Sequence, residues 1–146
     1  MRIQVRLLPV VLAGLVPLLA SAQHSPEVLP SGRACYRIYS AVRLVPEVDD
    51  YVGSEIVLWR CTVADVTAEW RLYEGGHEPE RIQLEGTFAE GRLILRGRVP
   101  GGSPVEIRAS FRGQTLTGTA LIGEFSKVAL KLPRVHLTWE ERLRRR

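Results

Sequence analysis

The chain has little of what marks enzymes, metalloproteins or nucleic-acid-binding proteins. It contains two cysteines and three histidines, and it has no nucleophile-elbow, zinc-protease or phosphate-loop motif. The histidines, His24, His77 and His136, are not spaced as ligands of one metal ion. We therefore expect no enzymatic activity, no cofactor and no metal site. An enzyme whose catalytic groups assemble across the fold is the remaining alternative.

Long apolar runs are also lacking, apart from one at the N-terminus that is too short to cross a bilayer. It extends from Leu7 to Ala20, follows Arg2 and Arg6, and ends in the small residues Ala20-Ser21-Ala22. A basic start, a short apolar run and a small-residue cleavage site are typical of a secretory signal peptide. We expect residues 1–22 to be removed. The mature protein should then be soluble in the periplasm or outside the cell, and should not span a membrane.

A strong charge of either sign is absent from the body of the mature chain. The formal net charge of +4 falls to +2 once Arg2 and Arg6 are removed, since 18 basic residues then stand against 16 acidic ones. Four arginines lie within the last five positions, 142–146. A neutral body argues against a nucleic-acid partner, which would require a basic face.

The two cysteines, Cys35 and Cys61, both belong to the mature part of the chain. An even number of cysteines in an oxidising compartment favours one disulfide bond between them. The mature chain, 146 minus 22 or 124 residues, is long enough for one domain. We divide it into a flexible segment over 23–32, a β-domain over 33–134 and a basic tail over 135–146.

Alternating apolar and polar residues fill the region from Arg33 to Leu132, as expected of strands that bury one face. Two-residue turns at Glu90-Gly91 and Gly113-Gln114, and a longer reversal from Pro100 to Pro104, separate the later strands. The pattern predicts an all-β fold of eight antiparallel strands in an up-and-down meander. A small closed barrel is the favoured architecture, because closure removes exposed strand edges, and a two-sheet sandwich is the alternative.

The register of each hairpin follows from keeping apolar residues opposite apolar ones. The two short turns predict four facing pairs: Phe88 with Leu93, Gly86 with Leu95, Phe111 with Leu116, and Ala109 with Gly118. For the longer loops we predict three more: Leu95 with Ala109, Gly118 with Leu132, and Ala68 with Gly86. A first hairpin centred on Val48 sets Ile38 against Leu58 on the inner face, and Cys35 against Cys61 on the outer face.

Small inward-facing residues indicate space inside the predicted barrel. The layer that the registers define contains Ala68, Gly86, Leu95, Ala109, Gly118 and Leu132, of which four are alanine or glycine. An eight-stranded barrel can hold one small ligand. The candidate ligand pocket comprises Arg60, Ala68, Trp70, Gly86, Leu95, Ala109 and Gly118, with Arg60 at its mouth. The alternative is a filled core, in which Trp70 or Tyr36 occupies the space and the glycines let the strands coil.

The C-terminal segment departs from the strand pattern. Residues Thr138-Trp139-Glu140-Glu141 have the spacing of a capping box, which predicts a short helical turn. We expect the segment to be a frayed and solvated tail.

Two functions from different classes fit these observations. The first is a non-catalytic, secreted or periplasmic β-barrel that binds a small apolar or amphipathic ligand inside the barrel. The second is a protein–protein interaction module of the cell envelope that docks through its outer face around Arg37, Tyr39 and Trp59. An arginine beside exposed aromatic residues is typical of such interfaces. We expect a monomer in either case.

Overall fold

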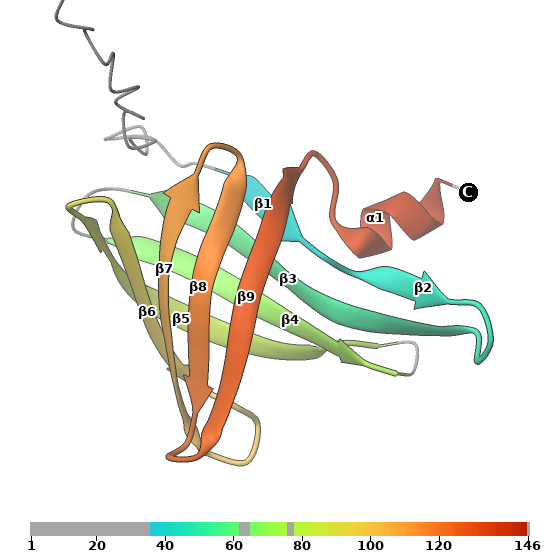
Figure 1. Ribbon diagram of the computed structural model, residues 1–146, viewed down its shortest axis with the longest axis horizontal. Coiled ribbons are helices and arrows are strands. Elements are labelled where there is room, and N and C mark those ends of the chain that lie inside the picture. Colours follow the sequence, from blue (N-terminus) through green and yellow to red (C-terminus); the bar gives the residue numbers. More distant parts are fainter. Residues whose placement is uncertain (1–35, 62–64, 76–77, 146) are drawn as a thin grey trace, which may run out of the picture.

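A computed structural model describes residues 36–61, 65–75 and 78–145, with Arg60 described by its backbone alone. Nine strands and one short helix make up this part of the chain (Figure 1). The strands are β1 (Arg37–Ser40), β2 (Arg43–Val45), β3 (Asp50–Cys61), β4 (Val66–Glu74), β5 (Glu80–Ala89), β6 (Arg92–Arg98), β7 (Pro104–Arg112), β8 (Thr115–Ile122) and β9 (Ser126–Val135). The helix is α1 (Trp139–Arg144).

The strands form one antiparallel sheet that closes on itself. From β3 to β9 each strand pairs with the next along the chain, and β1 pairs with both β3 and β9. An eight-stranded barrel results, with β2 as an additional strand beside β3. The predicted all-β antiparallel meander and closed barrel are confirmed, and the sandwich alternative is wrong. The predicted signal peptide lies outside the described residues.

The first arm of the hairpin predicted around Val48 is divided into β1 and β2, and this division opens the barrel at one end. At Ala41 the chain leaves the side of β9 and continues as β2 along the outer part of β3 (Figure 1). The Ala41 N–H donates to the Ser54 carbonyl at 3.0 Å. This crossing requires a glycine at position 53, where φ is +123° and a Cβ atom would lie 2.5 Å from the Ala41 oxygen.

The two short hairpin turns set their strands in the predicted register. Phe88 lies opposite Leu93, and Ala109 lies opposite Gly118. Glu90 and Gly91 both have positive φ, at 52° and 74°, which is the conformation that a two-residue hairpin turn requires. All four pairs predicted from these turns are confirmed.

The three pairs predicted across longer loops are wrong by two residues. Leu95 lies opposite Ile107, Gly118 opposite Leu130, and Ala68 opposite Leu84. In the loop between β6 and β7, the Val99 N–H donates to the Ser103 carbonyl at 3.0 Å, so the turn is centred on Gly101. A shift of two residues keeps every side chain on its face, and alternation alone therefore could not detect it.

The first hairpin differs from its prediction by a single residue. Ile38 lies opposite Val57, because the turn between β2 and β3 occupies the four residues from Pro46 to Asp49 and is not centred on Val48. A one-residue shift exchanges the two faces of a strand. Tyr39 consequently belongs to the barrel core, and Ile38 lies on the other face of β1.

The barrel interior is a continuous apolar core to which every strand except β2 contributes. A second and smaller cluster lies outside the barrel, where Trp139 of α1 packs against Val42 and Tyr73. Tyr51 and Leu143 pack against the same cluster. The C-terminal segment is thus a docked helix, and the prediction of a frayed, solvated tail is wrong for it.

Candidate functional site

Four of the residues predicted to line a pocket at the centre of the barrel belong to the buried apolar core. Ala68, Trp70 and Leu95 are fully buried there, and Ala109 is 7% exposed. The Tyr39 and Phe111 rings lie 5.4 Å apart, and Phe111 also contacts Phe88. These side chains supply the packing that the filled-core alternative assigned to Trp70 or Tyr36.

Tyr36 does not contribute to this packing, because it is 59% exposed.

The two glycines of the predicted pocket, Gly86 and Gly118, allow neighbouring strands to approach each other closely. A Cβ atom at Gly86 would lie 1.8 Å from the Ile94 carbonyl oxygen, and one at Gly118 would lie 2.2 Å from the Arg108 oxygen. Each is needed because a neighbouring backbone comes too close for a side chain.

The two-residue register shifts also disperse the predicted layer of small residues. Gly86 shares a row with Leu95 and Ile107, whereas Ala109 and Gly118 share a different row with Leu93 and Leu130. Each small residue therefore has large neighbours on adjacent strands. No single layer of small side chains crosses the described part of the barrel.

A β-bulge at Trp59 alters the faces at the end of β3. Leu58 pairs with Ala68, but Arg60 pairs with Thr67, so that β3 holds one residue more than β4 over this interval. Cys61 then lies opposite Val66, fully buried in the core. The inner row of β3 thus passes from Leu58 to Cys61.

The disulfide predicted between Cys35 and Cys61 stays a prediction, because Cys35 lies outside the described residues. The Arg60 side chain likewise lies outside the described part of the chain.

The outer patch predicted around Arg37, Tyr39 and Trp59 does not exist in that form. Tyr39 is fully buried inside the barrel as a consequence of the register of β1. Arg37 and Trp59 are half-buried on their strands. An interface that depends on an exposed Tyr39 is therefore excluded.

A groove of about 410 Å³ lies at the end of the barrel where β1 has turned away from β9. Its lining comes from β3 and β4 and from β8 and β9, together with Ala41. The lining residues are Ala41, Gly53, Ser54, Leu72, Glu74, Ile122, Val128, Ala129, Lys131 and Leu132. Sequence reasoning missed this groove, since nothing in the strand pattern marks the bend at Ala41.

The groove combines an apolar floor with polar groups near its edge. Leu72, Ile122 and Val128 are only partly buried, and all three pack against the barrel core. Glu74 and Lys131 are exposed and carry opposite charges. The arrangement suits a molecule that has an apolar portion and at least one polar or charged group.

Two other hollows of similar size lie over β6, β7 and β8. One, of about 400 Å³, is lined by Arg92 and Arg108 among others, and the second, of about 430 Å³, by Arg96 and Arg98. Arg96 and Arg108 are exposed, and both donate to Glu106. These hollows lie over a paired part of the sheet, in contrast to the groove at the barrel end.

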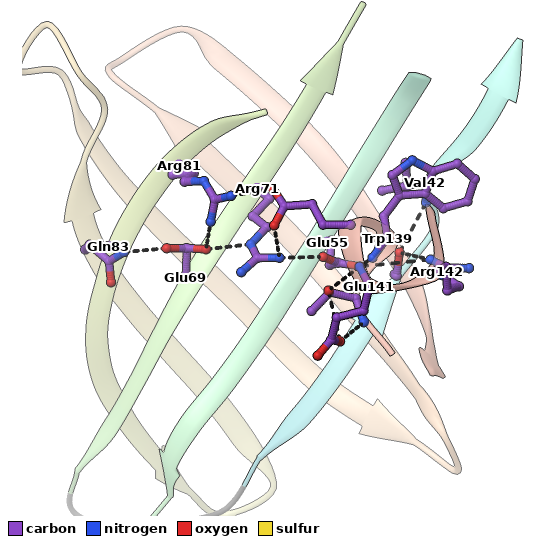
Figure 2. A network of polar contacts seen from close by, with 12 residues as sticks. Val42, Glu55, Glu69, Arg71, Arg81, Gln83, Trp139, Glu141 and Arg142 are labelled. Atoms are coloured by element: carbon purple, nitrogen blue, oxygen red, sulfur yellow. Dashed lines mark hydrogen bonds and ion pairs between the residues drawn. The ribbon is translucent and has the colours of Figure 1, made fainter. Parts of the chain in front are cut away.

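A charged network lies beneath α1 on the outer face of β1, β3 and β4 (Figure 2). Glu55 is fully buried and accepts a hydrogen bond from the Trp139 N–H at 2.9 Å and another from Arg71 at 3.2 Å. Burial raises the pKa of Glu55 above its usual value, against the opposing effects of the Trp139 N–H, Ser40 and Arg71. Arg142 also reaches this site and donates to the Ser40 hydroxyl at 3.2 Å.

Glu69 occupies the centre of the same network. Arg71 and Arg81 donate to one of its oxygens, and Gln83 donates to the other at 2.7 Å (Figure 2). Burial alone would raise the pKa of Glu69, but the hydrogen bond and the charge of Arg71 outweigh it, so the pKa lies below its usual value. Arg81 and Arg71 also pair with Glu140 of the helix.

The network attaches the helix to the barrel. Thr138 accepts from the Glu141 N–H, and Glu141 accepts from the Thr138 N–H, so the predicted capping box is confirmed. Trp139 is 7% exposed, and the Arg142 guanidinium lies 4.7 Å from its ring centre. We therefore interpret these contacts as structural, and the groove as the better candidate for a binding site.

No protein-family model, curated protein or solved structure matches the chain. Within residues 36–61, 65–75 and 78–145, no group of three His, Cys, Asp or Glu side chains is placed to hold a metal ion. Over the same ranges, no helix has the length and apolar character needed to cross a membrane.

Proposed function

We propose that this protein is an exported, non-catalytic β-barrel that binds a small amphipathic ligand in the groove at the open end of the barrel. The single observation that carries the proposal is the groove of about 410 Å³. Its volume falls within the range of roughly 300–1,000 Å³ that is typical of small-molecule sites. The groove lies apart from the centre of the barrel, which is occupied by the buried apolar core.

The ligand class follows from the residues that line the groove. Leu72, Ile122 and Val128 offer apolar surface that continues into the core, so transfer of an apolar group onto them is favourable. Lys131 offers a positive charge and Glu74 a negative one, close to the solvent. We therefore expect an apolar chain or ring with a polar head to be preferred over a sugar or a nucleotide.

Export is part of the proposal and rests on the N-terminal sequence. Cleavage after Ala22 would place the mature protein in the periplasm or outside the cell, where a disulfide between Cys35 and Cys61 can persist. N-terminal sequencing of the secreted protein should begin at Gln23. Retention of Met1 in the protein recovered from the host's cell envelope would contradict export by cleavage.

The binding test uses the fluorescent probe 1-anilinonaphthalene-8-sulfonate, which has an apolar ring system and one charged group. We expect the folded protein to bind one equivalent of probe, and Val128→Trp to weaken binding at least tenfold, because the larger side chain occupies the groove. Lys127→Trp is the matched control, since Lys127 is exposed on the same strand and does not line the groove. The same affinity in both variants, or no binding by the unaltered protein, would contradict the proposed function.

A further inference from the structure

Strand β9 has a partner along the whole of one edge but along little of the other. Its pairing with β8 extends from Ser126 to Pro133. Its pairing with β1 is limited to Arg134 and Val135, because β1 ends at Ser40 and the chain turns away at Ala41. Among the described strands, none pairs with the second edge of β9 between Ser126 and Pro133.

The backbone direction of β9 identifies the groups that face this open edge. The Arg134 N–H donates to the Gln114 carbonyl at 2.7 Å and therefore points toward β8. Successive residues of a strand direct their N–H and C=O groups to opposite sides. Lys127, Ala129 and Lys131 therefore present their backbone groups to the open edge, and all three residues are exposed.

Pro133 belongs to the same set of edge-facing residues. A proline lacks an N–H group, so it is tolerated at a strand edge where that group has no partner strand. Its position is consistent with an edge that ends near residue 133. The open edge thus consists of eight residues, Ser126–Pro133, a length suited to a short extended peptide.

The groove lies directly beside this edge, because Ala129 and Lys131 of the edge also line it. A strand added to β9 would direct alternate side chains inward, toward Leu72 and Val128, and the others outward. The outward side chains would lie beside Lys127 and Lys131, which are the only lysines of the chain. Apolar residues therefore fit the inward positions, and acidic residues fit the outward ones.

We propose that the ligand of the groove is an extended peptide segment that alternates apolar and acidic residues and adds to the β9 edge as a further strand. This inference rests on the proposed function, since it names the class of ligand that the groove binds. Lysines on an edge strand also discourage pairing between copies. Two copies joined through antiparallel β9 edges would bring like charges together, which disfavours a second copy as the occupant.

The test measures binding of an acetylated eight-residue peptide that alternates valine and glutamate. We expect saturable binding that weakens as salt is raised, because the lysine–glutamate attraction is screened. A peptide of alternating valine and lysine should bind at least tenfold more weakly. Two N-methylated versions of the acidic peptide, each methylated at alternate residues, block the amides of one edge or of the other. The version whose blocked amides face β9 should lose binding.

Two protein variants locate the binding site on the edge. Ala129→Pro removes an edge-facing N–H and should weaken binding of the acidic peptide at least tenfold. The double variant Lys127→Glu, Lys131→Glu should weaken it by a similar factor with the backbone unchanged. The double variant also keeps the test decisive if Ala129→Pro fails to fold.

The outcomes separate failure of this inference from failure of the proposed function. Probe binding without peptide binding would overturn strand addition and leave a small-molecule groove. Equal affinity of the acidic peptide for the unaltered protein and both variants would also overturn it. A dimer that Ala129→Pro converts to a monomer would identify a second copy as the occupant, and this result too would overturn the inference.

Discussion

The hairpins from β5 to β8 and the region where β1, β3 and β9 meet are built from the same alternating pattern, but they end differently. Along β6, β7 and β8 both edges of each strand are paired. Where β1 ends at Ser40, one edge of β9 has no partner among the described strands, and the groove begins. The barrel is thus closed by only two pairs between β1 and β9, which leave part of the β9 edge without a partner among the described strands.

The two regions also differ in how their outer faces are stabilised. Outside β6 and β7, exposed arginines pair with Glu106 near the solvent, where such contacts contribute little. Outside β1, β3 and β4, the helix α1 covers a buried network that includes Glu55 and Glu69. The open side of the barrel is therefore the side that carries the additional support.

The largest expected effect is in the fully paired region. Gly86→Val places a branched side chain where a Cβ atom would already lie 1.8 Å from the Ile94 oxygen. We expect a loss of about 3–4 kcal/mol in the free energy of unfolding, measured by urea denaturation. Thr87→Val on the exposed neighbouring position should change it by less than about 0.5 kcal/mol. Similar values for the two variants would show that the strands at Gly86 are not in close contact.

Proline substitutions compare a paired strand with the open edge directly. Thr119 of β8 lies opposite Ala129 of β9 and has a partner strand on each side. Thr119→Pro should cost about 3 kcal/mol, because it removes a ladder hydrogen bond. Ala129→Pro should cost less than about 1 kcal/mol, since its N–H faces the open edge. An equal loss in both would mean that the β9 edge has a partner, and the comparison would fail.

The contribution of the helix is tested by Trp139→Ala. Trp139 is 7% exposed and packs on Val42 and Tyr73, so we expect a loss of about 2–3 kcal/mol in the free energy of unfolding. The protection of the Trp139 backbone amide against hydrogen exchange should fall as well, because this N–H donates to Glu55. A protein of unchanged stability and protection would show that α1 is not held on the barrel in solution.

A smaller, pH-dependent effect distinguishes the two buried glutamates. Glu69 has a pKa below its usual value, so its stabilisation is present above about pH 4.5 and is lost as the pH falls through the folded-state pKa. Glu69→Gln should cost about 2 kcal/mol at pH 7, because charge-assisted hydrogen bonds are lost, and this difference should shrink in acid.

Glu55 is the matched comparison, because its pKa is shifted in the opposite direction to that of Glu69. Its pKa is raised by burial, so the stabilisation it contributes is complete below about pH 4.5 and is lost as the pH rises through the folded-state pKa. Relative to Glu55→Gln, the unaltered protein should therefore lose stability as the pH rises. Urea denaturation from pH 3 to pH 8 checks both variants, and slopes of the same sign would contradict the assigned environments.

The sequence was informative where the contacts are local. At Glu90-Gly91 a two-residue turn permits one register, and Phe88 therefore had to face Leu93. Between β6 and β7 the loop is longer, and shifting the pair Leu95–Ala109 by two residues kept the same faces. Alternation determines which face of a strand a residue occupies, but it does not determine the register between two paired strands when the shift is two residues.

The candidate site was not predictable for a related reason. The groove depends on where β1 stops pairing with β9, and on a one-residue shift that turns Tyr39 inward. The capping box at Thr138 was visible in the sequence, but its docking depends on Glu55, which is 84 positions from Trp139. Contacts at such separation leave no periodic signal in a single sequence.

The most direct test of the proposed binding site is nuclear magnetic resonance with the mature, isotope-labelled protein. Titration with the anilinonaphthalene probe should shift the backbone amide signals of Ser54, Leu72 and Ala129, which line the groove. The amides of Arg92 and Ser110, which line a hollow over β6 and β7, should remain unchanged. Shifts confined to Arg92 and Ser110, with none in the groove, would contradict binding at the open end of the barrel.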